Sequence, residues 1–204
     1  MSEHGASGLP ADEALSRLIE GNARFLRGEA RFPTVQKEIL ADLAKGQSPY
    51  ATILGCSDSR VPPELVFDAG FGELFVIRVA GNVVSAEIMG TLQYAAMHLQ
   101  TMLFVVLGHE GCGAVDAALA AHEPDVEHPA RIARLLESIT PGLAEIDRSR
   151  PRADQMHAAV EANVRWSIRQ LQATPEAEAR RREGRLKLVG AVYELETGRV
   201  RFLE

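Results

Sequence analysis

Apolar residues follow two patterns along the chain: short continuous runs, and longer stretches with helical spacing. Continuous apolar runs are typical of parallel strands that are buried on both faces. We therefore predict strands over Ala51–Gly55, Leu74–Val79 and Met102–Leu107. Their alternation with helical stretches indicates an α/β fold, in which helices flank a mostly parallel central β-sheet.

Helical spacing is clear near the start of the chain. Over Ala11–Gly28 one face carries a set of apolar side chains, Leu15, Leu18, Ile19, Phe25 and Leu26. Similar spacing predicts further helices over Val35–Ala44, Glu87–Gln100, Gly113–Ala121 and Ala153–Leu171. Within the predicted crossover helix Glu87–Gln100, the inward positions are expected to be Ile88, Leu92, Ala95 and Leu99.

The later part of the chain gives weaker patterns and then a hairpin. Pro124–Pro151 shows no clear periodicity, and the charged run Glu176–Glu183 is predicted to be a solvated helical face. Lys187–Leu195 and Arg199–Leu203 are separated by a turn that includes Thr197-Gly198. This arrangement predicts a C-terminal antiparallel hairpin that adds an edge strand to the sheet.

Length and charge limit the function classes. The 204 residues favour a single domain over residues 1–204, with residues 1–10 expected to be flexible. Lys and Arg number 22 against 28 Asp and Glu, a net charge of −6, which argues against a nucleic-acid partner. No apolar run approaches the roughly 20 residues of a membrane span, and the N-terminus lacks a signal pattern. We therefore expect a cytoplasmic protein without membrane contact.

Two of the predicted strands end in residues that can do chemistry. Ala51–Gly55 leads into Cys56-Ser57-Asp58-Ser59-Arg60, and the strand before Gly108 leads into His109-Glu110-Gly111-Cys112-Gly113. Because the carboxyl ends of parallel strands meet at one edge of a sheet, these side chains are expected to lie close together. Two thiols, an imidazole, a carboxylate and a guanidinium would then share one crevice.

The residue types at this edge suit a metal ion. Two Cys and one His are ligands that Zn²⁺ accepts, and three protein ligands with one open position are typical of a catalytic site. A lone Cys is ordinarily a small buried hydrophobe. Here both cysteines of the chain follow strands and stand beside polar residues, which favours a metal centre. The remaining histidines are assigned to the tail, a helix face or surface loops: His4, His98, His122, His128 and His157.

These motifs resemble the paired signature of the β-class carbonic anhydrases, with Cys56-Ser57-Asp58-Ser59-Arg60 followed by His109-x-x-Cys112. The resemblance extends from about Leu15 to Leu203 and includes Glu20–Phe25, Gly72–Arg78, Ala80–Asn82, Tyr94–Leu99 and Val189–Tyr193. It implies that Cys56, His109 and Cys112 bind one Zn²⁺ per chain. It also implies that Asp58 and Arg60 form a catalytic dyad beside the metal.

The implied activity is that of a lyase that reversibly hydrates carbon dioxide to bicarbonate and a proton. Zinc-bound hydroxide would attack CO₂, oriented by Asp58, while Arg60 would keep that carboxylate ionised and away from the metal. The N–H of Gly113, at a predicted helix start, would favour thiolate and the developing bicarbonate. Two thiolate ligands should leave the metal-bound water less acidic than in an all-histidine site, where its pKa is about 7.

Finer similarity points to the plant-type branch of this family. Gln47 stands nine positions before the first ligand, and Phe75 and Tyr94 match positions that line the CO₂ pocket of that branch. From the residues alone, Phe75 is a core strand residue and Tyr94 a packed helix residue, so their substrate-binding roles rest on the resemblance. Ile53 stands where the bicarbonate-inhibited branch carries Trp, and Val79 where many relatives have Asn. Because Ile53 replaces the Trp that helps to stabilise the closed form in that branch, we expect an open site at about pH 7–8.

Other functions remain open on the sequence. The nearest alternative keeps the fold and the zinc site but hydrolyses COS or CS₂. The non-enzyme alternative is a structural zinc or scaffold protein, with Asp58 as a permanent fourth ligand. A cysteine phosphatase with Cys56 as nucleophile lacks the backbone donors of a phosphate cradle and leaves Cys112 unexplained. A zinc deaminase would need a further cysteine pair.

An oligomer is also expected. The helix over Ala11–Gly28 has an apolar stripe but no following strand to cover, and relatives lay this helix over a partner subunit. We predict a homodimer or homotetramer, with Gln47, Phe75 and Tyr94 near the interface. Some of these side chains would then reach the zinc of the neighbouring subunit.

Overall fold

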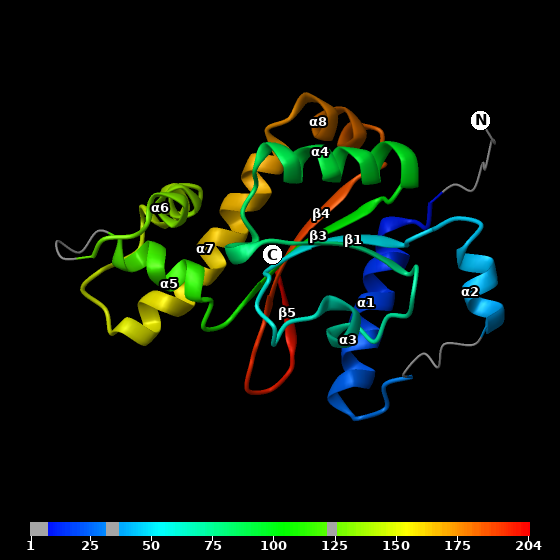
Figure 1. The fold of residues 1–204 in the computed structure, drawn as a ribbon, viewed down its shortest axis with the longest axis horizontal. Helices are drawn as coiled ribbons and strands as arrows, with labels where there is room; N and C mark the ends of the chain where they lie inside the picture. Colours follow the sequence, from blue (N-terminus) through cyan, green and yellow to red (C-terminus); the bar gives the residue numbers. More distant parts are fainter. Residues whose placement is uncertain (1–7, 32–36, 122–125) are drawn as a thin grey trace.

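The computed structural model describes residues 8–31, 37–121 and 126–204. These residues form a five-stranded sheet of order β2-β1-β3-β4-β5 (Figure 1). The parallel strands are β1 (Ala51–Gly55), β2 (Leu74–Arg78), β3 (Leu103–His109) and β4 (Lys187–Tyr193). The fifth strand, β5 (Val200–Leu203), is antiparallel to β4. The predicted fold class is therefore confirmed, with the C-terminal hairpin at one edge of the sheet.

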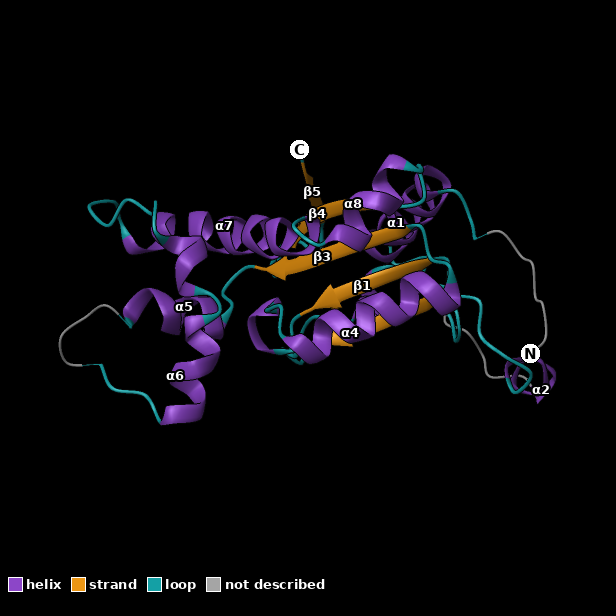
Figure 2. Ribbon diagram, turned by 90° about the horizontal axis from the view of Figure 1, so that it is seen from above, coloured by secondary structure: helices purple, strands orange, loops and turns teal. Residues whose placement is uncertain are grey.

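Helices cover both faces of this sheet (Figure 2). One face packs α1 (Ala11–Leu26) and α3 (Pro63–Val66) against Ile53 and Val105. The other face packs Leu54 and Phe104 against the remaining larger helices, α4 (Ala86–Tyr94), α5 (Gly113–Ala120), α6 (Ala130–Glu137) and α7 (Arg152–Gln172). Every residue of β1 and β3 is buried. This two-sided burial explains why these strands are continuous apolar runs rather than alternating ones.

Several predicted helices end differently in the structure. The predicted helix Glu87–Gln100 is α4 followed by a π-helical turn, η2 (Ala95–Leu99), which ends at Gln100 in a left-handed conformation with φ 55°. The segment Pro124–Pro151 contains α6 and a 3₁₀ turn, η3 (Thr140–Leu143). α2 spans Lys37–Leu43, and the predicted helix start at Val35 lies outside the described residues. The expected flexibility of the first residues likewise falls mostly on residues 1–7, outside the description.

The first helix carries the predicted apolar side chains, but the expectation that it has no strand to cover is wrong, because Leu18 packs with Ile53 and Val105. Ile19 and Leu26 are 48% and 43% exposed, while the buried positions of α1 are Ala14, Leu18, Gly21 and Asn22. The physical reason is a close backbone approach, because a Cβ on Gly21 would lie 1.8 Å from the carbonyl oxygen of Phe67. The small and polar residues of α1 therefore face the protein, and part of its apolar surface faces outward.

Two short elements follow β2 and α7. The 3₁₀ turn η1 (Ala80–Asn82) follows β2, and Gly81 within it has a φ of 67°, which favours glycine. α8 (Pro175–Arg182) begins after Thr174, whose hydroxyl accepts a hydrogen bond from the Ala177 N–H at 3.2 Å. As predicted, α8 is a charged helix with no buried residues.

Candidate metal centre

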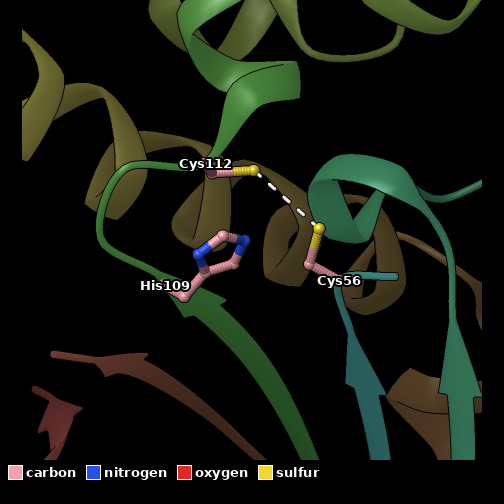
Figure 3. A group of neighbouring side chains, drawn as sticks. All are labelled: Cys56, His109 and Cys112. Atoms are coloured by element: carbon pink, nitrogen blue, oxygen red, sulfur yellow. Dashed lines mark hydrogen bonds between the residues drawn. The ribbon is translucent and has the colours of Figure 1, made fainter. Parts of the chain in front are cut away.

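Cys56, His109 and Cys112 meet at the carboxyl edge of the sheet (Figure 3). Cys56 follows β1, His109 is the last residue of the adjacent strand β3, and Cys112 stands at the N-terminus of α5. The two sulfur atoms are 3.9 Å apart, and one ligand atom from each of the three residues lies within 4.8 Å of the others. All three side chains are buried. The structure thus brings together the three residues that the sequence singled out.

The imidazole of His109 is held in one orientation. Its Nδ1 lies 2.8 Å from the carbonyl oxygen of Glu110, so Nδ1 carries the proton and donates it to that oxygen. Its Nε2 is buried and has no hydrogen-bond partner among the described residues. A buried polar atom without a partner is costly, and a metal ion between this nitrogen and the two sulfurs would satisfy it. The donor set therefore fits Zn²⁺, which takes thiolate and imidazole ligands.

The two thiols share a proton. The pKa of Cys56 is lowered chiefly by the hydrogen bond between its sulfur and the Cys112 thiol. The Gly81 N–H, 3.4 Å from the Cys56 sulfur, also lowers it. The same shared proton raises the pKa of Cys112, although the N–H groups of Val115 and Ala114 at the start of α5 oppose that rise. The pair therefore loses one proton readily and the second with difficulty.

Asp58 borders the same space and is held by Arg60. The guanidinium Nε donates to Oδ1 at 2.9 Å and Nη2 donates to Oδ2 at 2.7 Å, while the Arg60 backbone N–H donates to Oδ1 at 3.0 Å. These hydrogen bonds hold the pKa of Asp58 well below its usual range, so the carboxylate is ionised near neutrality. Its Oδ2 lies 3.9 Å from Nε2 of His109. The carboxylate is thus a neighbour of the three donor atoms.

Arg78 is a site residue that was not predicted from the sequence. It ends β2 and pairs in register with Gly55, the residue before Cys56. Its Nε donates to the carbonyl oxygen of Cys56 at 2.8 Å, and its Nη2 donates to that of Asp58. One guanidinium therefore fixes the backbone of the loop that carries both a candidate ligand and the carboxylate. The sequence feature that could have identified Arg78 is its positive charge at the end of an otherwise apolar strand.

Of the predicted substrate-binding residues, only some lie near the metal cluster of their own chain. Gly113 follows Cys112 directly as the first residue of α5. Gln47 is exposed in the loop before β1. Phe75 pairs with Thr52, four residues before Cys56, so at about 3.3 Å per strand residue it lies on the order of 13 Å away from the cluster. Tyr94 is 47% exposed, with its ring 6.3 Å from that of Phe75. Within one chain, these last three residues are not brought to the cluster.

A parallel sheet with a buried Cys-His-Cys triad and a forked Asp–Arg pair at its carboxyl edge defines the class of the protein as a zinc-type metalloenzyme. Residues 51–200 match the family described as carbonic anhydrase. The chain is 37% identical to carbonic anhydrase 2 of Mycobacterium tuberculosis, covering 91% of this chain and 89% of that protein. It is 38% identical to the carbonic anhydrase of Mycolicibacterium smegmatis, with 92% and 90% covered.

Solved structures agree with these sequence matches. The β-carbonic anhydrase CcaA superposes with a TM-score of 0.75 at 28% identity, covering 93% of this chain and 95% of that one. The Coccomyxa β-carbonic anhydrase in complex with acetazolamide gives 0.74 at 30% identity, covering 93% and 86%. The chain therefore belongs to the carbonic anhydrase family, in its β class. It is an enzyme that uses zinc and interconverts CO₂ with bicarbonate and a proton. These matches favour neither a COS or CS₂ hydrolase nor a structural scaffold.

Proposed function

We propose that Cys56, His109 and Cys112 are the residues that bind the zinc, one ion per chain. The observation that carries this assignment is the buried Nε2 of His109, which has no hydrogen-bond partner among the described residues and shares its space with two thiols. Zinc bound there would act as a Lewis acid that activates water for attack on CO₂, tempered by the charge of two thiolate ligands.

The Asp58–Arg60 pair is proposed to orient the reacting water. An ionised carboxylate can only accept hydrogen bonds, so Oδ2 of Asp58 takes one from the water and directs the oxygen lone pair toward CO₂. Arg60 occupies the carboxylate from the other side and keeps it from binding the metal. The N–H of Gly113, at the start of α5, stabilises negative charge as bicarbonate forms.

The apolar wall for CO₂ is proposed to come from a second copy of the chain. Phe75 and Tyr94 lie close together but far along the strand from their own Cys56. In a homodimer, these rings and Gln47 would face the neighbour's zinc, where the amide of Gln47 could donate to a substrate oxygen. β-Carbonic anhydrases of Sordaria macrospora are described as tetrameric, which supports a homodimer or homotetramer here.

We further propose that the chain belongs to the plant-type branch, which Gln47, Phe75 and Tyr94 support, and that residues 1–204 are a single domain. In residues 8–31, 37–121 and 126–204, no helix combines the length and apolar character needed to cross a membrane. We propose a cytoplasmic enzyme, because both cysteines are free thiols at the metal centre rather than partners in a disulfide.

Replacing a ligand tests the assignment. Cys56→Ser should lower both the zinc content and the rate of CO₂ hydration to near background, because serine is a poor zinc ligand. Zinc is measured by mass spectrometry and CO₂ hydration by stopped-flow on the same preparation. Ser57→Ala, at the exposed neighbouring position, is the matched control and should retain both. A Cys56→Ser protein with full zinc and full activity would refute the ligand set.

A further inference from the structure

A cavity lies away from the metal centre, and its lining includes residues of α4, β3 and α8. The two helices lie on the same side of the sheet (Figure 1). The cavity has a volume of about 300 Å³ and a mainly apolar lining, which includes Met89, Leu92, Met97, Phe104, Leu171 and Leu188. Phe104 is five residues before His109 on β3, so the cavity is roughly 16 Å from that ligand along the strand. A cavity of this size and character is typical of a small-molecule site.

One cation at this cavity lacks a partner. Arg180, on α8, lines the cavity, and its Nε is buried with no hydrogen-bond partner among the described residues. Burial first, and then the neighbouring Arg185 cation, lower the pKa of Arg180, while Glu183 offsets part of that effect. The Nε of Arg180 is shielded from water, although the side chain as a whole is only half-buried. An anion in the cavity would pair with this guanidinium, and a carboxylate matches its planar donors.

The other polar groups of the lining do not meet that need. The Thr174 hydroxyl donates to the carbonyl oxygen of Leu171 at 3.0 Å and accepts from Ala177, so it is already used within the protein. Gln93 and Glu176 are exposed at the cavity. The site therefore combines an apolar interior with a single under-compensated cation.

We propose that this cavity binds an amphipathic carboxylate, with an unbranched acyl chain of medium length against the apolar walls and its carboxylate on Arg180. The apolar lining disfavours a small inorganic anion, which would gain nothing from those walls. Met89 and Met97 are unbranched and flexible, so they can adapt to a flexible chain. The proposal does not depend on the zinc assignment, because no residue of the cavity belongs to the metal centre.

Calorimetric titration of the zinc-loaded protein with sodium decanoate tests the proposal. Excess acetate is present throughout, because acetate competes for a metal-bound carboxylate position but has no chain to fill the cavity. We expect saturable binding at one site per chain, weakened roughly fifteenfold when octanoate replaces decanoate, since each methylene contributes about fourfold. Decanol should bind at least about tenfold more weakly than decanoate, because it carries no charge for Arg180.

Variants locate the binding. Arg180→Met should weaken decanoate at least about tenfold while leaving decanol unchanged, because only the charge–charge contact is removed. Arg181→Met, on an exposed neighbour of the same helix, is the matched control and should bind like the parent. Ala177→Leu should weaken both ligands by filling the cavity. Retained CO₂ hydration shows that each variant is folded.

Either of two results would overturn the proposal. One is the absence of saturable decanoate binding by the parent protein in excess acetate. The other is an equal loss of affinity in the Arg180 and Arg181 variants, which would mean that surface charge attracts the fatty acid. The comparison of decanoate with decanol on the parent protein needs no variant, so the charge requirement can be tested even if a variant fails to fold.

Discussion

The two oxygens of Asp58 are occupied by one guanidinium, at 2.7 and 2.9 Å. A carboxylate two residues from a candidate ligand can reach the metal after a small shift of its loop, and Arg60 competes for it. Arg60, whose side chain is 54% exposed, thus controls the position of Asp58, whose side chain is 19% exposed. The pair is a positional device whose effect on stability is small, because surface ion pairs contribute little to folding.

Removing Arg60 should separate activity from metal binding. In Arg60→Ala, Asp58 is free to bind the zinc, so CO₂ hydration at pH 7–8 is expected to fall at least about tenfold with zinc content unchanged. Stopped-flow rates and metal analysis on the same sample check this. Arg27→Ala is the matched control, because Arg27 makes an exposed pair with Glu29 at the same spacing. Normal hydration by Arg60→Ala across this pH range would show that the dyad does not operate.

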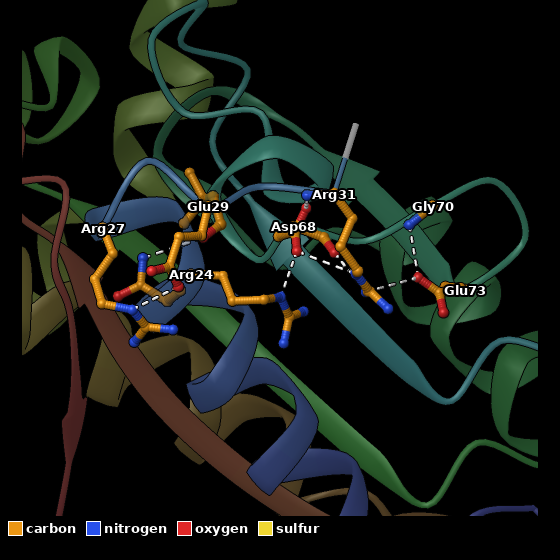
Figure 4. A network of polar contacts seen from close by, with 9 residues as sticks. Arg24, Arg27, Glu29, Arg31, Asp68, Gly70 and Glu73 are labelled. Atoms are coloured by element: carbon orange, nitrogen blue, oxygen red, sulfur yellow. Dashed lines mark hydrogen bonds and ion pairs between the residues drawn. The ribbon is translucent and has the colours of Figure 1, made fainter. Parts of the chain in front are cut away.

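Asp68 makes a different kind of ion pair, one that stabilises the fold (Figure 4). Its side chain is 3% exposed and accepts from Arg24 Nε at 2.6 Å and Arg31 Nε at 3.1 Å. Burial by itself would raise the pKa of Asp68, but the hydrogen bonds from these two arginines outweigh burial and lower it. A folded-state pKa below the unfolded value of about 3.9 stabilises the protein above that pH. The stabilisation is lost as the pH falls through the folded-state pKa.

Asp68→Asn should therefore lower the free energy of unfolding at pH 7 by on the order of 2 kcal/mol, with the difference shrinking below about pH 4. Urea titrations between pH 3 and 7 measure it. Asp42→Asn removes an exposed carboxylate that pairs with Lys45 and should change stability little at any pH. A pH-independent loss in Asp68→Asn would mean that packing, and not the charge, supplies the stabilisation.

At the residue scale, the sequence predicted the metal cluster but not its supports. Cys56, His109 and Cys112 could be found because strand ends in a parallel sheet share an edge, which needs no side-chain detail. The role of Arg78 could not be found, because it acts on carbonyl oxygens of the loop that follows the neighbouring strand, β1. That contact depends on the register between β1 and β2, and a strand sequence leaves its register open until the partner strand is known.

Among the elements, α7 supports the centre through η1. Asn163 is 1% exposed, and its Nδ2 donates to the carbonyl oxygen of Gly81 at 2.8 Å, while Ser167 Oγ donates to that of Asn82 at 3.0 Å. The Gly81 N–H faces the Cys56 sulfur. A Cβ on Gly81 would lie 2.7 Å from Ile139, so the turn is held from several sides. Asn163 is thus a positioning residue for the thiol environment.

Asn163→Ala should accelerate zinc loss to a chelator, because the η1 amide is no longer held against the sulfur. The expected change is about tenfold, followed with a colorimetric zinc indicator. Asn22→Ala is the control, since it removes a buried asparagine of α1 whose side chain also bonds backbone groups of distant segments, but away from the metal centre. Both variants should lose on the order of 1–2 kcal/mol of stability, but only Asn163→Ala should release zinc faster. Equal release rates would reduce Asn163 to a structural role.

Element boundaries show where periodicity is insufficient. The segment Glu87–Gln100 has the inward positions of one helix, yet its last turn is π-helical and ends in a left-handed Gln100. A π-turn changes the backbone hydrogen-bond pattern without any composition signal. Likewise, the outward position of Ile19 follows from the contact of Gly21 with Phe67, which joins segments far apart in sequence. Helical spacing can identify an apolar stripe, but it does not show which part of the stripe is covered.

At the scale of the whole molecule, the exposed apolar side chains of α1 argue for a partner subunit. Ile19→Arg should shift the protein to monomer in light scattering, because a charge cannot be buried at an apolar interface without a counter-charge. CO₂ hydration should fall as the molecular mass falls to that of the monomer, since the apolar wall proposed for CO₂ comes from the neighbouring subunit. Ile132→Arg, at an isoleucine that is 45% exposed on α6, is the control and should remain at least dimeric. A fully active Ile19→Arg monomer would show that each chain carries a complete site.

Asn22 ties the first helix to the last hairpin of the described chain. Its Nδ2 donates to the carbonyl oxygen of Gly198 at 2.9 Å, and its Oδ1 accepts from the Val200 N–H at 2.9 Å. On the ribosome, Gly198 is added 176 residues after Asn22, which at 5–20 residues per second is a delay of roughly 10 to 35 s. During that interval the nascent α1 can dock only on the segments already made, which include α3 and the strands β1 and β3. The hydrogen bonds of Asn22 to the hairpin form last, so the docking of α1 is completed late in synthesis.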